Sequence, residues 1–438
     1  MNNTCYGLIV AICVCAAPVS AFAGDISTDA TTILRFEKRD IPGTDKQSLL
    51  PATQFLGIDA EKLADGNLSA HFYGWGRYDL SVKSFNDEKA AGSLTYGYVQ
   101  YRFNQGGADI RAGRFSVREG IVNEQVDGIS ARTGLPMGFG LSVFGGTNVH
   151  TVHISGENSD GKGDALFGGR VEYRYKGLLE IGLSGVYESA APTLVSHTTG
   201  DYRRVGGDIW ISPGKMVDII GHSSYNTETD TFAEHSYLLT VKPVQHLVVT
   251  GTFNQQRDQS YLYAWTMFSA AALNPNDKSS SIGGSASYEI NKNLNVTTDY
   301  KHYRRELGSA DRFGGDVRVA NNDFTVRGGI GYHYLDAGQG FAIGSNTSAS
   351  YHELHCYALQ DTRGYFSAID LLGDFFKENI DNRNSAWEAT ATLGYHLTPA
   401  LALSGDISYG RNPQFTEEVK GLVRLTYNTT FTGTGGKK

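Results

Sequence analysis

The chain contains 438 residues, which is enough for about two or three ordinary domains or for one large barrel. Its mean hydropathy of −0.29 excludes a bundle of transmembrane helices, whereas a transmembrane barrel needs apolar side chains only at alternate positions. The formal net charge of −8 gives no basic surface for binding nucleic acid.

The first residues have the pattern of a secretory signal peptide. An apolar segment, residues 8–17, is followed by the small-x-small sequence Ala21-Phe22-Ala23, which is a typical cleavage site. No lysine or arginine precedes the apolar segment, which departs from the usual pattern. Residues 1–23 are therefore predicted to direct export and to be removed.

Cysteine usage argues against disulfides and against haem attachment. Loss of residues 1–23 would leave Cys356 as the single cysteine, so no intrachain disulfide is predicted. The sequence contains no CxxCH motif, so the chain is not expected to attach c-type haem covalently. We therefore predict that this chain carries no cofactor of its own.

Residues 24–66 lack the sustained alternation of the sequence that follows them. Residues 60–64 have the composition of a short helix. We expect residues 24–66 to form a periplasmic N-terminal segment or a plug folded into a lumen, and a disordered leader is the alternative.

From residue 67 onward, apolar and polar side chains alternate with period two, which predicts β-strands. The stretch from Ser281 to Arg305 shows the repeating unit, in which two alternating arms are joined by an asparagine-containing turn, as in a tight hairpin. About twenty such strands are expected, each near the length that a tilted barrel strand requires. The predicted fold is an all-β, antiparallel transmembrane barrel over residues 67–431, followed by a C-terminal tail, residues 432–438.

The connections between the predicted strands favour a membrane barrel over a soluble sandwich. Every second link is short and contains Gly, Pro, Asn or Asp, whereas many intervening links are long and polar, as in residues 147–164, 190–201, 257–280 and 337–348. Outer-membrane barrels have this pattern, with short turns in the periplasm and longer loops outside. No proline lies inside a predicted strand, where it would remove a hydrogen bond of the ladder.

If the apolar face of each strand meets lipid, the opposite face carries the charged residues and lines the lumen. An ionised side chain on the lipid side would cost about 2–4 kcal/mol at the membrane midplane, so the shared phase of these residues favours a wet interior. Both signs of charge occur, and the wall is interpreted either as an electrostatic surface for solutes or an inserted partner, or as a solvated interior. The predicted lumen-lining residues are Arg77, Asp79, Arg102, Arg111, Arg170, Glu172, Arg174, Glu180, Asp208, Asp218, Asp299, Lys301, Arg327, Glu388, Asp406 and Arg424.

Motifs for catalysis or metal binding are weak. The sequence has no G-x-S-x-G motif and no evident pair of catalytic carboxylates. His150 and His153 lie in or beside a predicted loop, and His352 and His355 fall on opposite faces of a predicted strand, so neither pair indicates a metal site. We predict no catalytic, metal-binding or cofactor-binding residues, and therefore not an enzyme.

Several phrases of the sequence resemble a known family. Four segments within residues 33–146 resemble the porin-like outer-membrane components of the porin-cytochrome conduits of metal-reducing bacteria. They are LRFEKRD, LLPATQFLGID, DGNLSAHFYGWGRYDLS and GRFSVREGIVNEQVDGISARTGLPMGFGLSVFGG. In that family a barrel sheathes a multi-haem c-type cytochrome, so that electrons cross the outer membrane. The resemblance implies periplasmic and surface multi-haem c-type cytochromes as partners, with haem only in those partners. It assigns no role to any single residue.

We therefore expect an outer-membrane channel of a Gram-negative bacterium, in contact with outer-membrane lipid and with no nucleic-acid partner. The first hypothesis is the porin-like sheath of a cytochrome, which serves electron transfer across the outer membrane. The alternative is a general or substrate-selective diffusion porin for small polar solutes, and a third hypothesis is an outer-membrane enzyme such as a lipase. A barrel of about twenty strands encloses more space than its side chains fill, so water, the N-terminal segment or another protein must occupy the lumen.

Overall fold

The computed structural model describes most of the chain and leaves out both ends and several connections. The described residues are 24–40, 47–63, 66–81, 89–103, 107–149, 165–191, 200–228, 230–257, 278–305, 308–338, 350–380, 382–413 and 415–432. The predicted signal peptide, residues 1–23, lies outside the described residues, and so does the predicted tail beyond its first residue.

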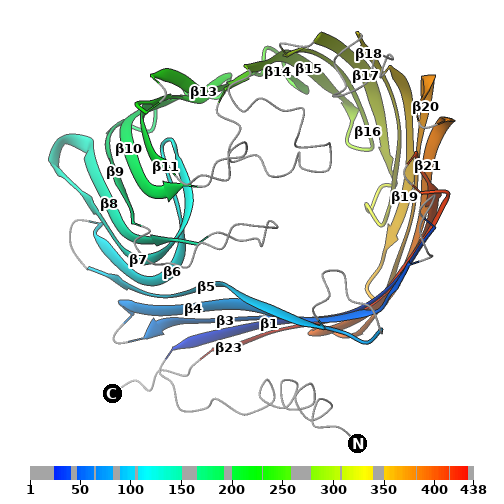
Figure 1. Cartoon of the computed structure of the whole chain (residues 1–438), viewed down its shortest axis with the longest axis horizontal. Helices are drawn as coiled ribbons and strands as arrows, with labels where there is room; N and C mark the ends of the chain where they lie inside the picture. Colours follow the sequence, from blue (N-terminus) through cyan, green and yellow to red (C-terminus); the bar gives the residue numbers. More distant parts are fainter. Residues whose placement is uncertain are drawn as a thin grey trace, which may run out of the picture.

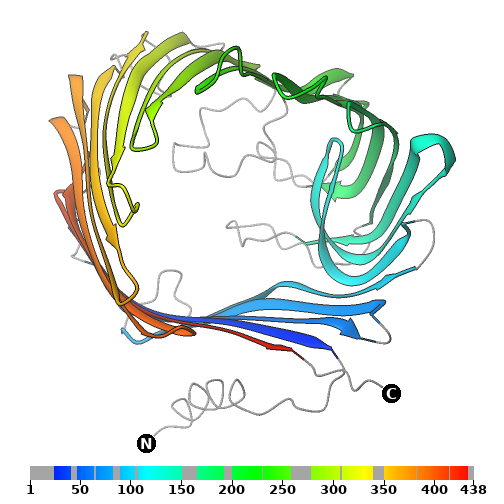
Figure 2. The same cartoon turned by 180° about the vertical axis from the view of Figure 1, so that it is seen from behind.

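The described residues form a closed antiparallel barrel, seen along its axis in Figure 1 and from the other end in Figure 2. From β3 onward each strand pairs with the next along the chain, and β1 pairs with both β3 and β23, which closes the ring. The short β2 is separated from β3 only by Leu50, and both pair with β1, so the ring has 22 strands. The strands are β1 (Asp25–Asp40), β2 (Gln47–Leu49), β3 (Pro51–Leu63), β4 (Leu68–Asp79), β5 (Ala90–Arg102), β6 (Asp109–Glu119), β7 (Val122–Gly134), β8 (Phe139–Asn148), β9 (Leu166–Tyr175), β10 (Leu179–Ala191), β11 (Gly200–Ile211), β12 (Val217–Asn226), β13 (Thr231–Val241), β14 (Leu247–Gln256), β15 (Ser279–Asn291), β16 (Leu294–Arg305), β17 (Gly308–Ala320), β18 (Val326–Ala337), β19 (Tyr351–Asp361), β20 (Tyr365–Ile380), β21 (Arg383–Thr398), β22 (Leu401–Arg411) and β23 (Glu417–Thr432).

The described strands within residues 24–66, namely 25–40, 47–49 and 51–63, are part of the wall, so the expectation of a plug or leader there is wrong. β1 lies between β23 and β3, and β3 pairs in turn with β4. Their alternation is hidden in the sequence because neighbouring residues share a chemical class: β1 contains consecutive polar residues at 27–29, and β3 contains consecutive apolar residues at 55–56. The described barrel therefore begins at Asp25 rather than at residue 67, and its 22 strands agree with the expected number of about twenty.

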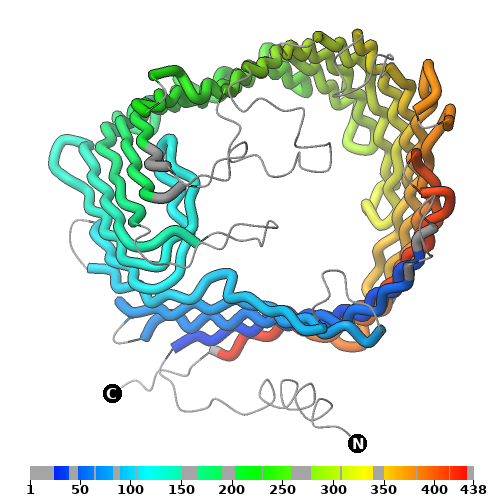
Figure 3. The backbone as a smooth tube through the Cα atoms, in the orientation of Figure 1, coloured from blue at the N-terminus to red at the C-terminus, as the bar shows by residue number. Residues whose placement is uncertain are grey.

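The register fixes which face of the wall is inside. The hairpin formed by β6 and β7 bends into the ring, and Figure 3 shows its backbone on the inner side of the wall. There the backbone amide of Ile121 donates a hydrogen bond of 3.1 Å to the hydroxyl of Ser184 on β10. Ser184 therefore faces the lumen, and the ladder pairs carry the same phase around the whole ring. On the opposite phase, Leu183 is 70% exposed, as expected for a side chain that faces lipid.

The connections at the two rims differ in length, as predicted. One rim carries tight turns, such as those between β9 and β10 and between β15 and β16, and the strand ends Asp25 and Thr432 pair at this rim. The other rim carries the long connections between β8 and β9 and between β14 and β15. Turns of this kind lie in the periplasm and longer loops lie outside. The described part of the chain contains no helix that is long and apolar enough to cross a membrane.

Candidate functional site

One hairpin leaves the wall and enters the lumen. β6 pairs with β5 only over residues 109–114, and β7 pairs with β8 only from residue 126 onward. Residues 115–125, which we call the inward hairpin, therefore form ladder pairs almost entirely within the hairpin itself. Figure 1 shows this hairpin beside the inner side of β10 and β11. It narrows the lumen along one side.

Two facing glycines allow the hairpin to bend away from the wall. Gly113 pairs with Gly128, and Gly113 has a φ of 125°, which side chains rarely adopt. A Cβ atom on Gly113 would lie 2.3 Å from the carbonyl oxygen of Gly97. A Cβ atom on Gly128 would lie 2.1 Å from the carbonyl oxygen of Gly145. Since both contacts are with backbone atoms of the neighbouring strands, a side chain at either position would force those strands apart.

An apolar cluster holds the inward hairpin against the wall. Val126 and Leu166 have no exposed surface, and Phe115 is 1% exposed. Full burial of a side chain of this type contributes about 1.5–3 kcal/mol, so the cluster is a local hydrophobic core inside an otherwise polar lumen. Its members are Phe115, Val117, Ile121, Val122, Val126, Phe144, Leu166 and Val186.

A network of charged side chains lies on the wall at the tip of the inward hairpin. Arg170 on β9 is 7% exposed and donates hydrogen bonds to Glu172, to Glu180 at 2.8 Å and to Asp208 at 3.1 Å. Arg174 pairs with Glu172 at 2.8 Å and with Glu180 at 2.9 Å. The two guanidinium groups of this network are thus shared among three carboxylates, and each charged group has at least one partner. The network fixes the wall on which the hairpin rests.

A cavity of about 260 Å³ lies between the inward hairpin and the base of β6, β7 and β8. Apolar side chains of the hairpin line one part of it, and Arg111, Arg132 and Asp109 line another. Arg132 donates a hydrogen bond of 2.8 Å to Asp109. Ordinary ligand pockets have volumes of roughly 300–1,000 Å³, so we interpret this cavity as a hydrated recess of the lumen.

The structure places every residue of the predicted lumen-lining set on the inward phase of its strand. Ser184 faces the lumen and is the ladder partner of Arg170, so Arg170 faces the lumen too. The same comparison of ladder partners from strand to strand places Asp299 on β16 and Asp406 on β22 on the inward face. Several of these side chains form ion pairs, such as Asp406 with Arg424 at 3.6 Å. Their contact with solutes or with a partner is still a prediction.

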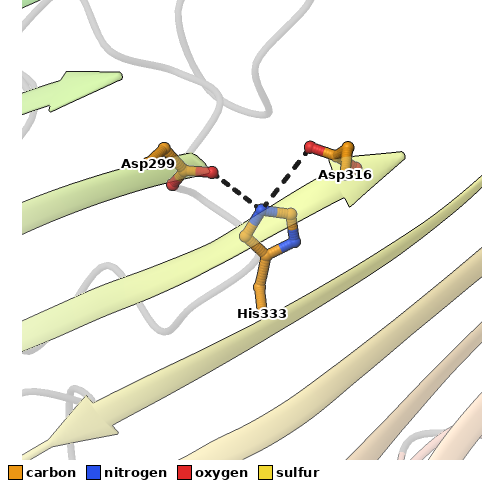
Figure 4. Close-up of side chains that lie close together, drawn as sticks. All are labelled: Asp299, Asp316 and His333. Carbon is orange, nitrogen blue, oxygen red and sulfur yellow. Dashed lines mark hydrogen bonds and ion pairs between the residues drawn. The ribbon is translucent and has the colours of Figure 1, made fainter. Parts of the chain in front are cut away.

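Sequence reasoning missed a cluster on the opposite wall, shown in Figure 4, and recognised only Asp299 of it. Nε2 of His333 on β18 lies 2.9 Å from a carboxylate oxygen of Asp299 on β16 and 3.8 Å from one of Asp316 on β17. Glu353 on β19 and Arg312 on β17 lie beside them. The three strands carry these residues at equal intervals in the sequence, but their proximity depends on the register, which alternation alone does not give.

Comparison with known proteins gives the fold and no closer relationship. No family model and no curated protein matches the sequence. The crystal structure of OccAB4 from Acinetobacter baumannii aligns with a TM-score of 0.44 and 10% identity over 94% of this chain and 100% of that chain. OccK1 (OpdK) from Pseudomonas aeruginosa aligns with a TM-score of 0.42 and 10% identity over 93% of this chain and 99% of that chain.

A mutant of the ferric enterobactin receptor PfeA from Pseudomonas aeruginosa aligns with a TM-score of 0.56 and 9% identity, over 92% of this chain and 80% of that chain. At such identities the likeness concerns the fold alone. The closed ring, its apolar outer face and its polar inner face agree with that fold. The chain therefore has the fold of outer-membrane β-barrels, a closed antiparallel ring of 22 strands in its described part.

Proposed function

We propose that the barrel is the porin-like sheath of an electron-transfer conduit and that its lumen houses a multi-haem c-type cytochrome. The sheath would hold the cytochrome across the outer membrane and keep its haems away from lipid, without redox chemistry of its own. The observation that carries this proposal is the width of the 22-stranded ring. In outer-membrane barrels of about 22 strands, wall side chains do not fill the lumen and a plug occupies it.

The chain does not use its N-terminal segment as that plug, because β1 and β3 belong to the wall. The inward hairpin rests against β10 and β11 and takes up one side of the lumen only. These points favour a separate polypeptide as the occupant, and the resemblance of residues 33–146 to conduit sheaths favours a multi-haem cytochrome.

The second candidate function is passive diffusion of small polar solutes. The inward hairpin and the charged network of Arg170 favour it, because an element that narrows a charged lumen is how a porin restricts what passes. In this case water would fill the space that the first proposal gives to a cytochrome.

Two measurements on the same preparation separate the candidates. The full chain is co-expressed with its genomic neighbours, extracted from outer membranes in mild detergent and examined by haem staining and visible absorbance. The sheath proposal expects a second polypeptide with covalent haem at a fixed ratio, and no haem absorbance from the barrel after the two are separated. The barrel alone should then conduct ions in planar bilayers, and added cytochrome should reduce that conductance.

Absence of any haem protein, together with a stable conductance that small polar solutes block, would establish the porin instead. Absence of both haem and conductance would overturn both candidates.

A further inference from the structure

The wall formed by β16 to β19 carries a side-chain cluster with the chemistry of a metal site. We propose that Asp299, Asp316 and Nε2 of His333 bind a divalent first-row transition-metal ion, with Zn²⁺ as the probe. The three side chains come from adjacent strands and point toward one another, as Figure 4 shows, and the register places them on the lumen phase. It does not depend on whether the lumen carries a cytochrome or solutes.

The ligand atoms are close to the separation that a metal ion requires. One ligand atom from each residue lies within 4.8 Å of the other two, and Nε2 of His333 is 2.9 Å and 3.8 Å from the two carboxylates. Ligand bonds of about 2.1 Å in tetrahedral geometry place ligand atoms about 3.4 Å apart. Small side-chain rotations would therefore bring all three atoms to bonding distance, and water would complete the coordination.

Glycines in register with the ligands provide the space for the site. Asp299 pairs with Gly314, and Gly314 pairs with His333, so no side chain separates the carboxylate from the imidazole. A Cβ atom on Gly314 would lie 2.4 Å from the imidazole ring. Asp316 pairs with Gly331, where a Cβ atom would lie 2.3 Å from the carboxylate of Asp316. The backbone of this wall therefore leaves room for convergent side chains.

The second nitrogen of His333 gives an independent indication of a ligand. The side chain of His333 is 8% exposed, and its buried Nδ1 has no hydrogen-bond partner among the described residues. Nδ1 lies 3.4 Å from a carboxylate oxygen of Glu353, which Arg312 holds at 3.4 Å. A histidine that binds a metal through one nitrogen commonly donates the other N–H to a carboxylate, which fixes the ring and raises its basicity. A small shift of Glu353 would make that hydrogen bond.

The charge balance of the cluster also favours a cation. The carboxylates of Asp299, Asp316 and Glu353 face one guanidinium, that of Arg312, which lies 3.1 Å from Asp299. An imidazole among carboxylates selects transition metals over Mg²⁺ and Ca²⁺, which prefer oxygen ligands alone. The competing arrangement is a protonated His333 that bridges Asp299 and Glu353 with no metal bound.

Metal binding by the purified full-length barrel in detergent, after chelator treatment and dialysis, tests the proposal. Titration with Zn²⁺ by calorimetry should show one site per chain, and Co²⁺ should give visible absorption bands of a low-coordinate nitrogen and oxygen site. Asp316→Asn and His333→Gln should each weaken Zn²⁺ binding at least tenfold. Asp316→Asn is the milder variant. The carboxylate of Asp316 lies 3.8 Å from Nε2 of His333, so the substitution removes no short hydrogen bond to the imidazole.

His355→Gln is the matched control. His355 on β19 also faces the lumen and pairs with a carboxylate, Asp370, at 2.8 Å, but it is not part of the three-residue cluster. This variant should bind Zn²⁺ as the unmodified chain does. No stoichiometric Zn²⁺ site in the unmodified chain, or equal losses in the control and in Asp316→Asn, would overturn the proposal in favour of the protonated bridge.

Discussion

The two sides of the lumen use the same kinds of inward-facing charged residue in different ways. On the hairpin side, the buried Arg170 on β9 bonds to a carboxylate of its own strand, to one on the adjacent β10 and to one on β11 beyond it. On the opposite wall, Asp299 and Glu353 share Arg312, and Asp316 lies 3.8 Å from Nε2 of His333. Glycines leave the space between these side chains open.

The difference shows that the number of inward charges does not determine what a stretch of wall does. Under the packed hairpin, two arginines pair with all three carboxylates, so this network stabilises the barrel. On the opposite wall, three carboxylates and one guanidinium surround the buried imidazole of His333, and a bound cation would balance the remaining negative charge. The network of Arg170 therefore stabilises the barrel, and the cluster of His333 is a candidate binding site. In the sequence, both consist of charged residues at alternate positions of their strands.

The largest expected effect is from Arg170→Met. Loss of the buried guanidinium leaves the partly buried carboxylates of Glu172, Glu180 and Asp208 side by side, and only Glu172 and Glu180 keep a partner, Arg174. Removal of one partner of a buried ion pair costs about 3–5 kcal/mol. Urea unfolding of the refolded barrel in detergent, followed by tryptophan fluorescence, should show a loss of that size. A loss below about 1 kcal/mol would show that this network contributes little to the stability of the barrel.

A matched pair of substitutions compares the two walls directly. Asp208→Asn removes a charged acceptor of Arg170 and should cost about 1.5–3 kcal/mol. Asp316→Asn removes a carboxylate from the side with excess negative charge, and in metal-free buffer it should change stability by no more than about 0.5 kcal/mol. The same urea titration measures both variants. Equal losses would remove the distinction between the two walls.

Gly128→Ala tests the bend of the inward hairpin. The new Cβ atom would lie 2.1 Å from the carbonyl oxygen of Gly145, so the strands must separate or the hairpin must leave its place. Overpacking of this kind costs about 1–3 kcal/mol. A displaced hairpin should also expose residues 115–125 to protease and raise the conductance in planar bilayers. Gly76→Ala is the control, because Gly76 lies within β4 and a Cβ atom there meets no other atom within 4 Å.

The smallest effect is expected from Arg174→Gln. Its side chain is 58% exposed, although it pairs with two carboxylates. Solvent screens such pairs, so the variant should lose no more than about 1 kcal/mol. Unfolding at as low a urea concentration as that of Arg170→Met would show that the difference in exposure does not separate the roles of the two arginines.

Alternation in the sequence predicts the strands from residue 67 onward and the inward phase of residues such as Arg77 and Asp406, because one period repeats over the whole barrel. It does not reveal β1 and β3, where neighbouring residues of the same class conceal the period. Strand pairing also brings Asp299 and His333 together through Gly314, and this register is not contained in any single strand. The inward hairpin depends on glycine contacts with backbone atoms of other strands, which a sequence pattern does not show.

Cysteine labelling at adjacent positions of β22 tests most directly whether the charged phase lines a wet lumen inside a membrane barrel. In a Cys356→Ser background, Asp406→Cys lies on the inward phase, and Ile407→Cys lies on the outward phase, where Ile407 is 60% exposed. In lipid vesicles, a water-soluble maleimide should label the cysteine at position 406 and not the one at position 407. A lipid-soluble reagent should label the cysteine at position 407. Equal labelling of both positions by the water-soluble reagent, or the reverse order, would show that the charged phase does not line a wet lumen.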